Sequence, residues 1–154
     1  MIRRKSEAPD PGDFSFPISP PAELPLPAVP GSRLKVYYET AENPGREPFK
    51  RAYNSNQGVY LDAGKYDGPL VLRNWRAGDR FCPLGSSKPR KLKELFAARK
   101  IARNRRRLWP VMESANGIVW VRGFPPAGHL ALSSSTERIL VIEEIAGEVG
   151  PESE

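Results

Sequence analysis

The amino-acid sequence predicts an α+β fold, with a small mixed or antiparallel sheet and two short helices. Short apolar or alternating runs, bounded by Gly, Pro or Asn, recur along the chain and are typical of strands. Between them lies one run whose apolar residues stand three and four positions apart, the spacing of an amphipathic helix. The order strands, helices, strands indicates an early strand-only portion and a later mixed portion.

The first thirty residues are rich in proline. They contain eight of the chain's 17 prolines, and proline can neither donate to a strand ladder nor continue a helix. We therefore expect residues 1–30 to form a disordered or polyproline-like lead-in, with the folded part beginning near Gly31. Residues 146–154 are acidic and are expected to form a disordered tail.

Four runs predict individual strands. One alternates polar and apolar residues as a half-buried strand does, two are short runs next to glycine, and one is apolar throughout. In chain order they are residues 33–38, 58–62, 70–73 and 139–142. Residues 111–113 and 118–122 predict a hairpin, because Asn116-Gly117 between them favours the turn that hairpins need.

A helix is predicted after the loop that follows residue 85. Leu92, Leu95 and Phe96 are spaced to form one apolar stripe facing the core. A serine at position 86 or 87 is expected to cap this helix, with Pro89 in its first turn. A second short helix is expected over residues 103–108, ended by Trp109-Pro110.

Residues 88–107 concentrate the positive charge of the chain. They hold ten Lys and Arg side chains and one acid, Glu94, whereas the whole chain has a net charge of only +6. A single basic patch on a mildly acidic body is the electrostatic footprint of a nucleic-acid binder. The alternative is a solvated helix face, but such faces usually interleave acids with bases four positions apart. The near absence of acids favours a binding surface.

A tight turn centred on Ala77-Gly78 brings three arginines close to Trp75. In one interpretation Arg73, Arg76 and Arg80 contact phosphates while the indole stacks on a sugar or an unpaired base. In the other, Trp75 fills the core and Asp79 pairs with one arginine to fix the turn. The sequence leaves both interpretations open.

Several kinds of catalytic site are excluded. Cys82 and His129 are the only residues of their types, so no disulfide, four-thiolate zinc site or ordinary catalytic triad can form. The sequence contains no Walker loop, dinucleotide-binding glycine motif or Ser-Gly-Gly-x-Asp-Ser pyrophosphatase loop. Asp62, Asp67 and Asp79 adjoin turn residues and are expected to be ordinary turn aspartates. Cys82 is expected to be a small buried hydrophobe, and His129 a loop residue.

No long apolar run occurs, and the basic start of the chain is not followed by an apolar segment. We therefore expect a cytoplasmic protein with no membrane partner.

Four segments together resemble the C-terminal domain of tRNA(Ile)-lysidine synthetase. They are residues 73–85, 91–101, 107–111 and 117–123. Their order and spacing make the match specific, and the likeness runs from about Leu70 to Glu143. Residues 58–63 also look like the segment that leads into that domain.

The resemblance implies an enzyme that joins lysine, with ATP, to the wobble cytidine of an isoleucine tRNA. In that family the chemistry, with its ATP and Mg, belongs to an N-terminal ATP-pyrophosphatase domain. The C-terminal domain is similar to one in the phenylalanyl-tRNA synthetase β-subunit and grips the tRNA acceptor stem. In this chain a proline-rich stretch stands where the catalytic domain would be. We therefore expect no catalytic residue, cofactor or metal here, and no activity from the chain alone.

A strand-containing segment over residues 31–66 and a tRNA-binding domain over residues 67–145 are the expected units. The binding residues would form a basic face on the acceptor-stem backbone, because A-form helices are recognised largely by shape, phosphates and 2′-hydroxyls. They are Arg73, Asn74, Arg76, Arg80, Lys91, Lys93, Lys100, Arg103, Arg105 and Arg106.

Two other functions fit the same residues. One is a generic double-stranded RNA, nucleic-acid or ribosome-associated binding module with no catalytic partner. The other is half of a split synthetase, which docks on a separate ATP-pyrophosphatase domain through its apolar surface.

Overall fold

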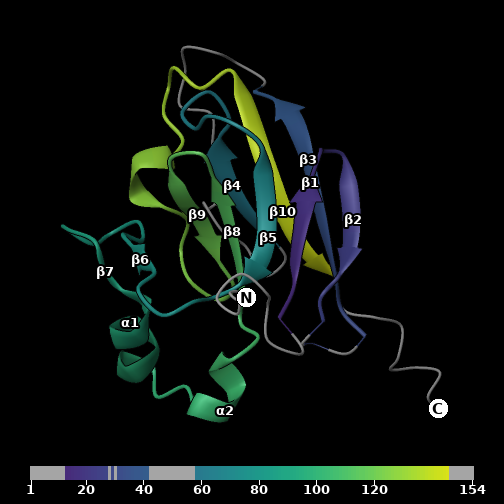
Figure 1. Ribbon diagram of the computed structural model, residues 1–154. Coiled ribbons are helices and arrows are strands. Elements are labelled where there is room, and N and C mark those ends of the chain that lie inside the picture. Colours follow the sequence, from purple (N-terminus) through teal and green to yellow (C-terminus); the bar gives the residue numbers. More distant parts are fainter. Residues whose placement is uncertain (1–12, 28, 30, 42–57, 146–154) are drawn as a thin grey trace, which may run out of the picture.

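Two four-stranded antiparallel sheets form the body of the protein in the computed structural model (Figure 1). The first sheet has the spatial order β1 (Ser15–Ile18), β5 (Leu70–Asn74), β8 (Pro110–Ser114), β9 (Gly117–Val121). The second has the order β2 (Ala22–Pro25), β3 (Arg33–Thr40), β10 (Arg138–Ile145), β4 (Gly58–Asp62). The structure describes residues 13–27, 29, 31–41 and 58–145.

Short elements complete the fold. The strands β6 (Arg80–Phe81) and β7 (Arg90–Lys91) pair as a ribbon, and a 3₁₀ turn spans Gly128–Leu130. The helices α1 (Leu92–Ala98) and α2 (Arg103–Arg106) lie below the sheets in Figure 1, at one end of the molecule. The α+β class with two short helices is confirmed, and the sheets are antiparallel rather than mixed across the described residues.

One hydrophobic core joins the two sheets and the first helix. It includes Leu72 of β5, Val36 of β3 and Leu140 of β10, all fully buried. Leu92, Leu95 and Phe96 of α1 belong to the same cluster, as their spacing predicted. The helix is therefore fixed to the sheets by its apolar stripe, and its other side chains point outward.

The expected lead-in without strands is wrong for the part of residues 1–30 that the structure describes. β1 pairs with β5, and β2 pairs with β3. Both are edge strands, and an edge strand tolerates proline because one row of its backbone groups needs no partner. Pro17 and Pro25 therefore lie inside β1 and β2. The remaining part of that prediction, residues 1–12, lies outside the described residues, as does the tail 146–154.

The boundary expected near residue 67 does not separate two units. β10, from the later part of the chain, lies between β3 and β4 from the earlier part. Val141 pairs with Tyr37 on one side and with Tyr60 on the other. β3 and β4 therefore share a sheet with a strand of the segment that was expected to fold apart from them.

The predicted strands and the hairpin are present. β4 covers residues 58–62, and β8 and β9 form a hairpin whose turn ends at Gly117, with a φ of 127°. The capping prediction for α1 is wrong. Lys91 occupies the N-cap position without a side-chain hydrogen bond. Arg90 and Lys91 form β7 instead of a helical turn, so the helix begins only at Leu92. None of the described helices is long and apolar enough to cross a bilayer.

Candidate nucleic-acid interface

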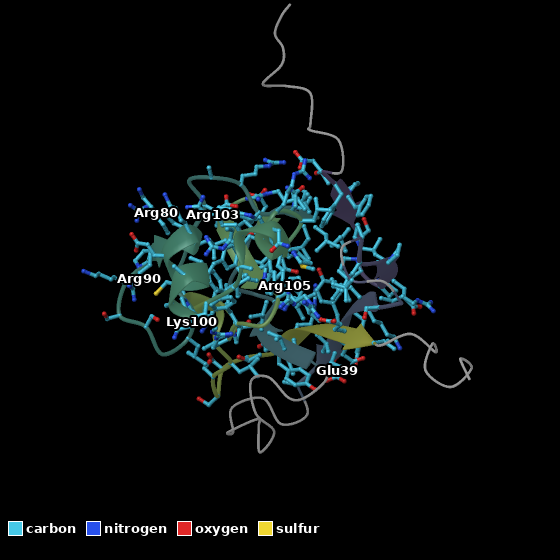
Figure 2. The ribbon with its side chains drawn as sticks, turned by 90° about the horizontal axis from the view of Figure 1, so that it is seen from below. Glu39, Arg80, Arg90, Lys100, Arg103 and Arg105 are labelled. Atoms are coloured by element: carbon cyan, nitrogen blue, oxygen red, sulfur yellow. The ribbon has the colours of Figure 1, made fainter. Side chains whose placement is uncertain are left out.

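Exposed cations gather on the end of the molecule that carries the two helices. Within the described part of the chain, none of these side chains pairs with a carboxylate. We call seven of them the basic end: Arg76, Arg80, Lys91, Lys93, Lys100, Arg103 and Arg105. Lys88 and Arg99 are exposed in the same stretch, and the Arg99 guanidinium contacts the Gly123 carbonyl and the Phe124 ring. Figure 2, seen from below, shows Arg80, Lys100, Arg103 and Arg105 over this region, whereas Glu39 lies apart from them on the strand side.

Two further cations of the region have weak carboxylate partners. Arg90 is 3.8 Å from Glu94, and both side chains are about half exposed. The guanidinium of Arg107 is 3.6 Å from Asp13. Exposed pairs of this kind contribute about 0–1 kcal/mol and do not neutralise the surface. The region therefore keeps a strong positive potential.

Arg73 does not belong to this surface, which corrects the sequence-based prediction. Its side chain is 5% exposed. Its Nε donates to Glu113 at 2.5 Å, and its two terminal nitrogens donate to the Asp79 carboxylate at 3.0 Å each. Burial by itself lowers the pKa of Arg73, but the hydrogen bonds to Asp79 and Glu113 outweigh burial and raise the pKa above its ordinary value. Arg73 is a structural cation.

Asn74 is also structural. It is 5% exposed, and its side-chain oxygen accepts a hydrogen bond from the backbone nitrogen of Phe14 at 2.9 Å. Its amide nitrogen donates to the backbone oxygens of Trp75 and Arg107 at 3.1 and 3.4 Å and to Asp13 at 3.2 Å. Both polar atoms of the Asn74 side chain therefore have partners within the protein.

The Asp79 turn holds part of the basic end in place. The carboxylate of Asp79 accepts from the backbone nitrogen of Arg76 at 2.7 Å, and its backbone oxygen accepts from Leu92 at 2.9 Å. Gly78 has a φ of 94°, the left-handed conformation that favours glycine. Asp79 thus connects buried Arg73 to the turn and to the start of α1. The interpretation in which Asp79 pairs with an arginine is confirmed.

Trp75 is half-buried rather than fully exposed. Its ring meets Phe96 of α1 edge to face, with the centroids 5.2 Å apart and the planes at 89°. It also lines a cavity of about 650 Å³ together with Arg76, Lys93 and Arg103. Trp75 therefore packs against the core, and its stacking on RNA stays a prediction.

Arg106 is partly engaged by the protein. Its Nε donates to the backbone oxygen of Ile101 at 2.8 Å, and its guanidinium lies 5.8 Å from the Phe96 ring. It still lines the 650 Å³ cavity. Arg107 lines the same cavity but was absent from the predicted binding residues, although it lies in the basic run 103–107 that marked the region.

A second hollow, of about 530 Å³, lies beside the β6–β7 ribbon. Arg80 and Lys91, both predicted, line it together with Lys88 and Arg90, which the prediction left out. Lys88 and Arg90 could have been predicted as members of this surface, because both lie in the basic stretch 88–107.

The isolated polar residues have the ordinary roles that the sequence suggested, with one exception. Asp62 accepts from the backbone of Gly64 at 2.8 Å and from the Thr136 hydroxyl at 2.8 Å, as a turn aspartate does. His129 is exposed in the 3₁₀ turn. Cys82 is only partly buried, which differs from the expected buried hydrophobe.

Known proteins are similar to this chain in sequence and in fold. The family model described as the TilS substrate C-terminal domain matches residues 70–142. The tRNA(Ile)-lysidine synthase of Solibacter usitatus is 34% identical over 118 residues, which cover 76% of this chain and 27% of that protein. The enzyme of Geobacillus kaustophilus is 33% identical over 131 residues, covering 84% of this chain and 26% of that protein.

One solved structure agrees with these matches. A crystal structure of the TilS C-terminal domain superposes with a TM-score of 0.70 and 30% identity, covering 87% of this chain and 97% of that chain. A weaker match, with a TM-score of 0.47 and 14% identity, is an N-terminal fragment of the phenylalanyl-tRNA synthetase β-subunit from Pyrococcus horikoshii.

The fold and sequence define an α+β domain homologous to the C-terminal part of tRNA(Ile)-lysidine synthases. This chain belongs to the family of TilS C-terminal domains. It spans about a quarter of the length of the curated relatives described above, 27% and 26%.

Proposed function

We propose that this domain binds the acceptor stem of an isoleucine tRNA through its basic end, for lysidine formation carried out elsewhere. The observation that carries the proposal is the set of seven exposed cations without carboxylate partners among the described residues. Like charges gathered on one surface repel one another and lower the stability of the fold unless a bound anion neutralises them. Duplex RNA supplies that anion as two rows of phosphates.

The arrangement of the cations suits a duplex backbone. They are carried by four short elements, by the Arg76 turn and by the link between α1 and α2, which holds Lys100. The buried Arg73–Asp79 pair and the apolar stripe of α1 fix this region to the sheets. A preorganised surface loses less conformational freedom on binding than a flexible tail. The step that uses ATP and Mg belongs, in this proposal, to an ATP-pyrophosphatase domain outside these residues, either fused to the chain or separate from it. We expect the protein to act in the cytoplasm, where its tRNA substrate is processed.

Filter binding of isoleucine tRNA at increasing salt tests the proposal. If about six phosphates are contacted, the affinity falls roughly a thousandfold between 50 and 200 mM salt, because each neutralised phosphate releases counterions. A flat salt dependence would contradict the proposal.

Competition separates a tRNA-binding domain from a generic nucleic-acid binder. Unlabelled isoleucine tRNA is expected to displace labelled tRNA at lower concentration than duplex DNA of equal length, because an A-form helix presents 2′-hydroxyls and a different groove shape. Equal potency of the two competitors would favour the generic function instead.

A further inference from the structure

We propose that the 650 Å³ cavity between the Arg76 turn and α2 binds an unpaired nucleotide adjoining the RNA duplex. This inference rests on the proposed function, because it assigns a part of the same RNA to one place on the basic end. A continuous duplex is recognised along its backbone and does not require a hollow. The cavity falls within the range of roughly 300–1,000 Å³ that is usual for ligand pockets.

The walls of the cavity supply the two groups that an unpaired nucleotide needs. Half-buried Trp75 lines it, and so do the exposed cations Arg76, Lys93 and Arg103. An aromatic ring offers a stacking surface to any base, and the cations hold its phosphate. Among the described residues of the lining, Asp13 is the one carboxylate, and it lies 3.6 Å from Arg107. The cavity therefore has a strong excess of positive charge beside an aromatic surface.

The cavity is built rather than accidental. Buried Asn74 donates to the backbone oxygens of Trp75 and Arg107, two residues of the lining that lie 32 positions apart in the chain. The backbone nitrogen of Trp75 donates to Trp109 at 2.9 Å. The contact with Phe96 fixes the orientation of the Trp75 ring. These contacts hold the stacking surface in place before a ligand arrives, which lowers the entropy cost of binding.

The cations around the cavity divide into two groups with different roles. Arg106 and Arg107 have protein partners, the Ile101 carbonyl and Asp13. Within the described residues, the side chains of Arg76, Lys93 and Arg103 have no carboxylate partner. Arginine and aromatic groups side by side fit a base and its phosphate better than an acidic peptide, which has no flat ring to stack. The ligand class is therefore a nucleotide.

The test compares two RNA hairpins that share one stem. One hairpin ends bluntly and the other carries a four-nucleotide single-stranded 3′ extension. The full chain is expected to bind the extended hairpin about tenfold more tightly, because one further base stacks on an aromatic ring. This difference corresponds to about 1.4 kcal/mol. Trp75→Leu is expected to remove that preference and leave blunt-hairpin binding unchanged.

Two more variants keep the test decisive. Arg76→Gln changes a side chain outside the core and is expected to reduce the preference, even if Trp75→Leu fails to fold. Tyr38→Leu removes an exposed aromatic ring on β3, away from the cavity, and is expected to keep the preference.

Three results would overturn the inference. Equal affinity of the wild-type chain for both hairpins removes the nucleotide site but leaves duplex binding intact. Displacement of the extension by a polyglutamate peptide at concentrations similar to those of an oligonucleotide indicates a peptide site instead. Absence of binding to either hairpin overturns the proposed function together with this inference.

Discussion

Charged side chains are arranged in opposite ways in the two sheets and at the basic end. On the sheets, Arg33 contacts Glu23 at 2.6 Å and Arg122 contacts Glu144 at 2.8 Å. Arg138 lies 4.2 Å from the Tyr38 ring centroid. At the basic end, seven exposed cations have no carboxylate partner among the described residues. The charged side chains that stabilise the fold are paired with other protein groups. The cations of the basic end that have no carboxylate partner are available to a ligand.

Removal of the buried cation is expected to have the largest effect. Arg73→Met leaves the carboxylates of Asp79 and Glu113 without their shared partner, and breaking a buried pair in this way costs about 3–5 kcal/mol. Denaturant unfolding measures the loss. The matched control is Arg33→Met, which breaks the exposed pair with Glu23 and is expected to cost less than about 1 kcal/mol. Similar losses for the two variants would contradict the division into structural and open cations.

Neutralisation of cations of the basic end is expected to weaken tRNA binding without lowering the stability of the domain. The triple variant Lys91→Gln, Lys93→Gln and Arg103→Gln removes three exposed charges that hold nothing else in the described structure. Its free energy of unfolding is expected to stay within about 0.5 kcal/mol of the wild type or to rise slightly, because like-charge repulsion is relieved. Its tRNA affinity is expected to fall. A large loss of stability would show that these cations serve the fold.

Lys100 provides a smaller and more pointed test. It has a φ of 58°, and the nitrogens of Lys100 and Ile101 donate to the carbonyls of Ala97 and Phe96, which is the glycine-favouring Schellman end of a helix. A side chain in this conformation costs about 1 kcal/mol. Lys100→Gly is therefore expected to stabilise the domain by about that amount while weakening tRNA binding.

The control for that variant is Ala98→Gly in the last residue of α1. Glycine there is expected to destabilise the domain by about 0.5–1 kcal/mol, because the backbone is ordinary helix. If Lys100→Gly destabilised the domain as well, the lysine at this left-handed position would not be strained. The idea that its strain is retained for RNA binding would then be wrong.

The smallest expected effect is a pH dependence on the sheet side. Burial, followed by its hydrogen bond to Glu143 at 2.9 Å, raises the pKa of Tyr37 to about 12. Because the folded pKa lies above the unfolded value of about 10, this stabilisation is complete below pH 10 and is lost as the pH rises toward 12. Urea unfolding at pH 9 and 11 is expected to show a smaller loss for Tyr37→Phe than for the wild type. Equal losses would contradict this role of Tyr37.

Local signals predicted the later part of the fold well. The hairpin of β8 and β9 follows from Asn116-Gly117, and α1 follows from the spacing of Leu92, Leu95 and Phe96. These features depend on residues close together in the chain. β1 and β2 were missed because proline argues against a strand, and only the complete sheet shows that both strands lie at edges.

The candidate site could be predicted only in part for a similar reason. The basic stretch 88–107 identified the correct end of the molecule. The role of Arg73 depends on Glu113, which is 40 positions away on the neighbouring strand β8. A hint was present, since Arg73 ends the apolar run 70–72 of a strand that the fold buries. The sequence alone could not decide whether its charge met a carboxylate or a phosphate.

The salt dependence of tRNA binding tests the central claim most directly, with the triple variant of Lys91, Lys93 and Arg103 compared with the wild type. If these three cations bind phosphates, the slope of log affinity against log salt becomes shallower by about 0.9 for each phosphate that the variant no longer neutralises. The control is the double variant Lys35→Gln and Lys65→Gln, on the sheet side, which is expected to keep the wild-type slope. Equal slopes for the wild type and the triple variant would contradict the claim that the open cations of the basic end bind the RNA backbone.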